Sequence, residues 1–544
     1  MRRYSLSASA IVLTAGSVLS ACGGGDETLF TGGSGAGSTS AGGGGADTTS
    51  TGGSGGSTQS PVCKPTGGGP HWLLETETVS FQVECISGLD LPGTDFDISP
   101  LPSGATYNPD TQTFTFTPGL DQAQVYNLTI TVKSTGETGT VKVGVADHFL
   151  DPANVPVKDP ILYTEEYGLP VLFLSPPPPT EDYSPATVIY KGHTYTASAK
   201  LRGAASLWYP KNSYTIEFDK EDKFDEPDEA GGFKNKRKIV LISTFDDNSY
   251  VRQRLAYDLW NRLDKGHLQI QTYSAVVYIN GQYFGLYTVS DHIDGFLMED
   301  HGYDQDGNLY KAVNHDANFD VTSPQNGGAP KVTLHDGYVK REGTPLEGEP
   351  GAFADLEDLV QFIATSPQSD FLSQIDGRID RRDFEDWWIF VTFTMADDSA
   401  GKNSYLYHDP LTPGGVFRYA PWDFNASFGQ TWQTAREAAK KTVEYKGNKL
   451  FSRFLAEPTI GDPLRTRYVA TLHGLYSKEA IINIVDSYIK RIDKSALRDE
   501  ARWVDEYQNY SGWNWRNDFT TYQEEVVYLK QWISDRWDYQ DGLY

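Results

Sequence analysis

One stretch, Met395–Gly429, constrains the fold of this 544-residue chain more than any other. It begins with two carboxylates, Asp397 and Asp398, and Asn403 follows five residues after Asp398. The pattern then predicts a strand, a Pro/Gly turn and a second strand, at 403–408, 409–415 and 416–420, and Asp423 comes next. Because a hairpin brings its two ends together, Asp398, Asn403 and Asp423 are expected to converge on one point.

A carboxylate, an amide and a second carboxylate around a hairpin are typical of a magnesium site. Mg²⁺ prefers hard oxygen ligands and is held by one or two carboxylates together with substrate phosphates. Protein kinases space a base Asp and a metal-binding Asn as D-x-x-x-x-N, with a second metal-binding Asp after a short hairpin. Asp398 and Asn403 have this spacing, and Asp423 has the later position. The spacing alone leaves an alternative open, in which Asp398 caps a turn and Asp423 caps a helix start.

The first 22 residues have the pattern of an export signal. Arg2 and Arg3 precede an apolar run, 8–19, which leads into Leu-Ser-Ala-Cys22. This order predicts a signal peptide rather than a membrane span. It resembles the bacterial lipobox, in which the cysteine becomes the lipidated first residue, so Cys22 is expected to anchor an exported protein to the cell envelope. The alternative is an ordinary signal peptide that is cut before an unrelated cysteine.

Residues 23–70 and 71–150 carry no expected chemistry. The first segment is rich in Gly, Ser and Thr, cannot bury a core, and is expected to be a flexible linker. The second segment alternates apolar and polar residues, as at 113–117 and 126–132, which predicts a small all-β module. Its Leu101–Thr111 segment resembles the immunoglobulin-like domains of bacterial surface proteins, which implies a β-sandwich that serves as a spacer or adhesive module.

Three cysteines bound the redox chemistry. With Cys22 lipidated, Cys63 and Cys85 remain, and export makes a disulfide between them the expectation. The sequence contains no C-x-x-C pair and no H-E-x-x-H motif, so it does not support a structural zinc site or a zinc hydrolase.

The chain is strongly acidic, with a formal net charge of −27 and a pI near 4.7. This charge argues against nucleic acid or an anionic membrane surface as a partner, so membrane contact is expected through the lipid anchor alone. It favours a cation or a basic protein substrate. The solubility of an exported protein explains the charge equally well.

The remaining residues, 153–544, carry several motifs in a fixed order. They are Arg202-Gly203 followed by Lys211-Asn-Ser-Tyr214, the Ile279–Tyr287 hairpin with an Asn-Gly turn, Gly307–Lys311, Asn403–Tyr407 and Pro421–Phe424. From Asp383 onward apolar stripes, such as Trp387, Phe390 and Phe393, predict helices. Two acidic or Gly-rich inserts, 221–232 and 323–350, are expected to be surface loops.

In this combination the chain resembles the spore-coat protein H (CotH) kinase family, which consists of secreted or surface-exposed atypical protein kinases. The resemblance covers about 163–544 and implies an α+β fold, with an atypical kinase-like two-lobed domain after the small all-β sandwich. It also implies transfer of phosphate from ATP, with Mg²⁺ or Mn²⁺, to Ser or Thr of a protein substrate. Asp398 resembles the catalytic-loop Asp of the family, and Asn403 and Asp423 resemble its metal ligands.

The resemblance also implies a cation that binds the ATP phosphates. Lys211 is the first candidate, Lys311 is a rival, and Arg202 is a third. Asp291 stands where the family usually has Glu, and if that residue pairs with the phosphate-binding lysine, the shorter side chain shifts the pair.

The chain departs from the family at several positions. Asn425 stands two residues after Asp423, where family members commonly carry a second acid, and no G-x-G-x-x-G loop is present. The Asp-to-Asn interval varies within the family, so Asp397 is an alternative to Asp398. These departures support a rival hypothesis, a surface structural or adhesion protein that keeps the kinase fold without activity. Scarce ATP outside the cytoplasm supports the same hypothesis.

Overall fold

The computed structural model describes residues 62–150, 158–226, 228–229, 233–443, 445, 447–513 and 518–544, and only the backbone at Asp397. The expected signal peptide, the lipidation at Cys22 and most of the 23–70 linker lie outside the described residues. Within the described ranges, no helix has both the length and the apolar character that crossing a membrane requires.

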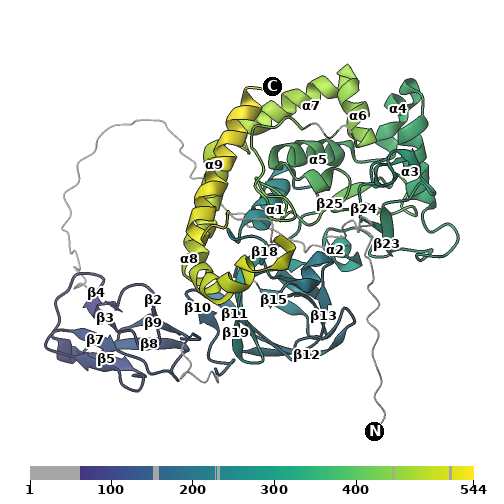
Figure 1. Cartoon of the computed structure of the whole chain (residues 1–544). Helices are drawn as coiled ribbons and strands as arrows, with labels where there is room; N and C mark the ends of the chain where they lie inside the picture. Colours follow the sequence, from purple (N-terminus) through teal and green to yellow (C-terminus); the bar gives the residue numbers. More distant parts are fainter. Residues whose placement is uncertain are drawn as a thin grey trace, which may run out of the picture.

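Residues 62–150 form a β-sandwich (Figure 1). Its strands are β1 (Pro65–Thr66), β2 (His71–Leu74), β3 (Val79–Gln82), β4 (Glu84–Cys85), β5 (Phe96–Ser99), β6 (Thr106–Asn108), β7 (Thr113–Phe116), β8 (Val125–Val132) and β9 (Thr138–Ala146). The sheets β2-β9-β8-β5 and β3-β7-β6 share one core, because alternate residues such as Phe114, Leu128 and Val143 point inward. The expected Cys63–Cys85 disulfide is present and buried in this core.

A second sheet closes on itself. Its strands are β10 (Glu165–Glu166), β11 (Leu169–Ser175), β12 (Ser184–Tyr190), β13 (His193–Arg202), β14 (Ser213–Phe218), β17 (Lys238–Ile242), β18 (Thr272–Ile279) and β19 (Gln282–Asp291). The strands follow the order β10-β11-β12-β13-β14-β17-β19-β18, and a parallel pairing of β18 with β11 completes the ring. Asn280 and Gly281 have left-handed φ angles of 51° and 77°, which fit the predicted Asn-Gly turn between β18 and β19.

Side chains alternate between the two faces of the closed sheet, and each face packs into a separate hydrophobic core. Leu172, Ile216 and Val277 belong to a cluster to which every strand of the sheet except β10 contributes, so this cluster fills the interior. Val276 and Tyr278 belong instead to the larger core of the domain, together with helix α1 (Arg252–Leu263). The strand β18 is therefore buried at every position.

The rest of the chain forms a smaller, four-stranded sheet with helices around it. Strands β20 (Asn308–Ala312), β23 (Tyr338–Glu342), β24 (Ser404–His408) and β25 (Arg418–Pro421) pair in the order β23-β20-β24-β25. The helices are α2 (Gly295–Asp300), α3 (Ala354–Thr365), α4 (Gln368–Gln374), α5 (Arg381–Thr394), α6 (Lys449–Ala456), α7 (Pro458–His473), α8 (Lys478–Gln508) and α9 (Tyr522–Asp541). Figure 1 shows α8 and α9 along one side of the domain, from the closed sheet to the helical part.

The expected α+β class is confirmed, and the kinase-like two-lobed arrangement stays a prediction. The two inserts are not only loops. The 323–350 insert contributes β23 to the smaller sheet, and the 221–232 insert contains β15 (Phe224–Glu226), which pairs with β16 (Phe233–Lys236). Phe224 is fully buried in the closed sheet's core, so burial overrides the acidic and Gly-rich local composition.

Buried charges join the sandwich to the rest of the chain; we call Glu75, Asp147, Lys158, Glu166 and Arg498 the junction network. Lys158 Nζ lies 2.7 Å from Asp147 Oδ1 and 3.4 Å from Glu75 Oε1. Arg498, on α8, donates to the Asp147 carbonyl at 2.7 Å and to Glu166 Oε1 at 2.9 Å. The sandwich accordingly lies against β10 and α8 in Figure 1.

Candidate active site

Asp398 lies in a short 3-10 turn, Asp397–Ala400, directly after α5. The helix ends where Met395 takes a left-handed φ of 50°, and the Trp387 indole N–H donates to the Ser399 carbonyl at 3.1 Å. The buried aromatic stripe of α5, which the sequence predicts, therefore also holds the turn that carries Asp398.

The Asp398 carboxylate is largely buried and lies between two basic side chains. Lys402 Nζ is 3.1 Å from its Oδ2, and His315 Nε2 is 3.4 Å from its Oδ1. Burial favours a higher pKa, but the His315 hydrogen bond and the Lys402 charge outweigh it, so the pKa of Asp398 is lowered. Asp398 is therefore ionised at neutral pH, and it orients a donor better than it holds a proton.

The β24–β25 hairpin brings Asn403 and Asp423 together, as expected from the sequence. Ser404 is opposite Pro421 in the register, so the residues just outside the hairpin lie at the same end. Asn403 Nδ2 donates to the Asp423 carbonyl at 3.4 Å. Both residues take left-handed φ angles, 58° and 61°, a conformation that costs energy in residues other than glycine and clusters at functional sites.

Asp423 holds a buried carboxylate oxygen that has no hydrogen-bond partner. Its side chain is 4% exposed, its backbone N–H donates to the Tyr257 hydroxyl at 3.0 Å, and its Oδ2 is unsatisfied. Burial, with the charge of Asp246 next, raises the pKa of Asp423 to about 7, while Lys311 and Lys402 oppose the shift. An unsatisfied buried oxygen is rare in proteins and fits a ligand of a cation.

The helix-cap alternative is wrong for Asp423. Residues 424–430 form bends and turns, and the next helix, α6, begins only at Lys449. Among the described side chains, no group of three or more His, Cys, Asp or Glu is placed to hold a metal ion. One carboxylate and one amide are nevertheless enough for Mg²⁺, which keeps several waters and takes further oxygens from phosphates.

Two of the predicted cations lie against the Trp422 ring, beside Asp423. Lys311 Nζ is 4.3 Å from the ring centroid, and the Arg202 guanidinium is 4.7 Å from it. Lys311 reaches the site from β20, where it is opposite Tyr405 of the hairpin. Because the indole face attracts both cations, it holds them next to the carboxylate that Lys311 already influences.

The other two predicted residues have different partners. Lys211 is fully buried, and its Nζ donates to Asp499 Oδ1 at 2.6 Å and to the Leu286 carbonyl at 2.7 Å. Burial lowers the pKa of Lys211 although Asp499 opposes the shift. Asp291 pairs with Lys236 at 2.9 Å, rather than with Lys211 or Lys311. The structure thus brings Lys311 and Arg202 to Trp422, and it gives Lys211 and Asp291 places in other ion pairs.

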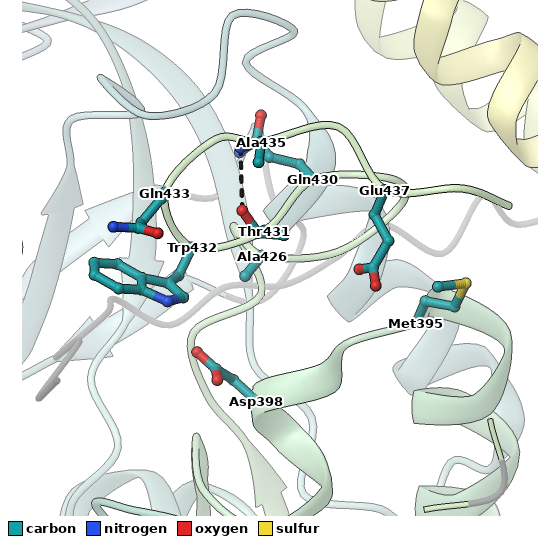
Figure 2. Close-up of a pocket in the computed structure, with 9 residues that line it drawn as sticks. All are labelled: Met395, Asp398, Ala426, Gln430, Thr431, Trp432, Gln433, Ala435 and Glu437. Atoms are coloured by element: carbon teal, nitrogen blue, oxygen red, sulfur yellow. Dashed lines mark hydrogen bonds between the residues drawn. The ribbon is translucent and has the colours of Figure 1, made fainter. Parts of the chain in front are cut away.

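A pocket of about 470 Å³ opens beside Asp398. Figure 2 shows Asp398 on one side and the loop that carries Trp432 on the other, with the Asp398 carboxylate directed toward that loop. The lining residues are Met395, Asp398, Ala426, Gln430, Thr431, Trp432, Gln433, Ala435 and Glu437. A side-chain hydroxyl that enters this pocket comes close to Asp398.

Sequence reasoning missed Asp246, which follows β17. Its Oδ2 accepts from Asn425 Nδ2 at 2.6 Å and from the Tyr209 hydroxyl at 3.3 Å. Burial, with the charge of Asp247 next, raises the pKa of Asp246 to about 6. The available signal was the Asp246-Asp247 pair soon after a buried strand, a common place for site residues.

Residues 199–540 match the model of a family described as CotH kinase protein. The chain belongs to this family. It is also 26% identical, over 359 residues, to the Inner spore coat protein H of Bacillus subtilis (strain 168). The aligned residues make up 66% of this chain and 90% of the relative. The expected family is therefore confirmed. The matched range contains the CotH residues from Arg202 to Asp423 described above, and it leaves out the sandwich.

Proposed function

We propose that this CotH protein is an exported, Mg-ATP-dependent protein kinase that phosphorylates Ser or Thr of surface or secreted proteins. The observation that carries the proposal is the buried, unsatisfied Asp423 oxygen next to Asn403, with Lys311 and Arg202 held on the adjacent Trp422 ring. A cation ligand and two positive groups in one place suit a polyphosphate. Membership of the CotH kinase protein family supports the same activity.

Asp423 and Asn403 are the residues that would hold Mg²⁺ or Mn²⁺. Such an ion supplies positive charge to the oxygens of the transferring phosphoryl group when it is bound. Lys311 and Arg202 supply further charge to the phosphates. The Trp422 ring fixes the directions of both cations, so little side-chain freedom is lost when phosphate binds.

Asp398 acts on the acceptor hydroxyl in the adjoining pocket. The hydroxyl oxygen forms a bond to the γ-phosphorus of ATP, while the bond from that phosphorus to the β–γ bridging oxygen breaks. ADP leaves with the bonding electron pair, and the hydroxyl proton passes to the Asp398 carboxylate. Because its pKa is lowered, Asp398 mainly orients the hydroxyl and accepts the proton late in the transfer.

Export through the signal peptide, a lipid anchor at Cys22 and a basic, Ser/Thr-rich substrate complete the proposal. The first two rest on the N-terminal sequence, and they support a location at the bacterial cell envelope, with access to proteins outside the cytoplasm. The basic character of the substrate rests on the net charge of −27, and its Ser and Thr content rests on the family.

A second candidate function is a surface structural or adhesion protein without phosphoryl transfer. Two observations favour it: Asp398 is held by Lys402 and His315, and the Bacillus subtilis relative is named as a coat protein. In this case the sandwich provides the adhesive surface and the CotH domain serves as a scaffold.

Radiolabelled ATP and the purified full chain distinguish these candidates. The parent should label itself or an added basic protein in the presence of Mg²⁺ or Mn²⁺. Asp398→Asn should abolish labelling and keep the metal-dependent thermal stabilisation by ATP, because it removes the proton acceptor and spares the metal ligands. Asp462→Asn, at an exposed position on α7, is the matched control and should behave as the parent. A parent that transfers no label favours the structural candidate.

A further inference from the structure

We propose that Asp246 is a second carboxylate ligand of the cation that Asp423 binds, and that Asn425 holds Asp246 in position for it. The inference rests on the proposed function, because it concerns the same cation. It adds a ligand from the loop after β17, far in sequence from the hairpin that carries Asp423.

The loop after Asp423 donates two hydrogen bonds to Asp246. Asn425 Nδ2 donates to the Asp246 carboxylate at 2.6 Å, and Gln430 Nε2 donates to the Asp246 backbone carbonyl at 2.8 Å. Tyr209 adds a hydroxyl donor to the same carboxylate oxygen, Oδ2. The segment that positions Asp423 therefore also positions Asp246, and both side-chain donors contact Oδ2.

The two carboxylates are neighbours in the fold, because Asn425, only two residues after Asp423, donates to Asp246. No ion pair joins either carboxylate to a cation in the part of the chain that the structure describes. Two neighbouring acids repel each other, and a cation bound between them removes this repulsion. The unsatisfied Oδ2 of Asp423 is the second, independent sign of a ligand.

The neighbouring Asp247 makes a useful contrast. Its carboxylate pairs with Arg252 at 2.7 Å and accepts from the Ser249 hydroxyl at 2.6 Å and from the Arg252 backbone N–H at 2.9 Å. Asp247 is thus fully used in holding the start of α1. Of the two adjacent acids, only Asp246 has a carboxylate directed to the Asp423 loop.

A reciprocal exchange tests the assignment. The variants are Asp246→Asn, Asn425→Asp and the double variant, all in the full chain, and calorimetry measures the affinity for Mn²⁺ with and without ATP. Asp246→Asn should weaken Mn²⁺ binding by roughly 10- to 100-fold. The double variant should recover most of this loss, because it keeps an amide–carboxylate hydrogen bond and returns a carboxylate to the site. Thermal denaturation without metal should show that Asp246→Asn is no less stable than the parent.

Asp423→Asn separates this inference from the proposed function. If Asp423→Asn loses Mn²⁺ binding and Asp246→Asn keeps the parent affinity, the cation site stands and the role of Asp246 is refuted. If the double variant binds as weakly as Asp246→Asn, the exchange with Asn425 is refuted. If the parent itself binds no Mn²⁺ in the presence of ATP, the proposed function and this inference both fail.

Discussion

Asp423→Asn should stabilise the metal-free protein, and by far more at pH 8 than at pH 4. The pKa of Asp423 is raised from 3.8 to about 7, a difference of about three units. Each unit corresponds to about 1.4 kcal/mol, so the ionised carboxylate costs up to about 4 kcal/mol in the folded state. The folded protein holds a proton that the unfolded chain releases between about pH 4 and pH 7, so stability is lost as the pH rises through this window.

Asn has nearly the size of Asp and no charge, so the variant escapes this loss. For the roughly 390 residues that follow the sandwich, average unfolding entropies convert about 4 kcal/mol into a rise of about 5 °C in Tm. The charge of Asp246 contributes part of the shift, so this value is an upper estimate. Thermal denaturation of the full chain with EDTA, at pH 4 and at pH 8, measures the effect.

An exposed carboxylate, Asp462, provides the control. Asp462→Asn removes an exposed charge and should change Tm by less than about 1 °C at both pH values. Saturating Mn²⁺ and ATP should reverse the order at pH 8, because only the parent gains the cation. A Tm difference between Asp423→Asn and the parent that is equal at pH 4 and pH 8, or a variant less stable at pH 8, would refute the buried-carboxylate argument.

Three further predictions follow from the ion pairs and the cysteines. Lys311→Met should reduce ATP stabilisation and spare the metal-free Tm at pH 4, where Asp423 is protonated. Lys211→Met should instead destabilise the fold by roughly 3–5 kcal/mol, because buried Asp499 loses its cation. Thermal shift with and without Mg-ATP tests both variants, and the opposite pattern would assign the phosphate role to Lys211. Removing the Cys63–Cys85 disulfide should destabilise the sandwich by about 3 kcal/mol, because the disulfide closes a loop of 22 residues, and chemical denaturation measures this loss. Two free thiols in the exported protein would contradict the disulfide. Cys22→Ser should release the protein from the membrane fraction, and unchanged fractionation would argue against lipidation.

Features that depend on local sequence were predictable. The Asn280-Gly281 turn, the aromatic stripe of α5 and the β24–β25 hairpin each follow from residues close together in the chain. The meeting of Asn403 and Asp423 follows from the hairpin alone, because its register places both residues at one end. Local patterns were sufficient here because turn chemistry and side-chain periodicity act over a few residues.

Features that depend on distant partners were not predictable. Lys211 pairs with Asp499, which is 288 residues away, and Asn425 holds Asp246 across 179 residues. The parallel pairing of β11 with β18, which closes the large sheet and sets Val171 opposite Val276, is also remote in sequence. In each case the position along the chain does not reveal the partner, because only the folded core selects it. The unexpected strand β23 has the same origin, since pairing with β20 outweighs its loop-like composition.

The junction network changes the way in which the sandwich can serve this protein. A module on a free hinge would alter only how far the pocket reaches, because the CotH domain could then turn in every direction. Here Arg498 and Asp499 are consecutive on α8, and one contacts the sandwich carbonyl of Asp147 while the other pairs with Lys211. The sandwich and the CotH domain therefore turn together, so a surface bound by the sandwich would also decide which way the pocket faces. Removing the sandwich would then change the direction of the pocket and not only its distance from that surface.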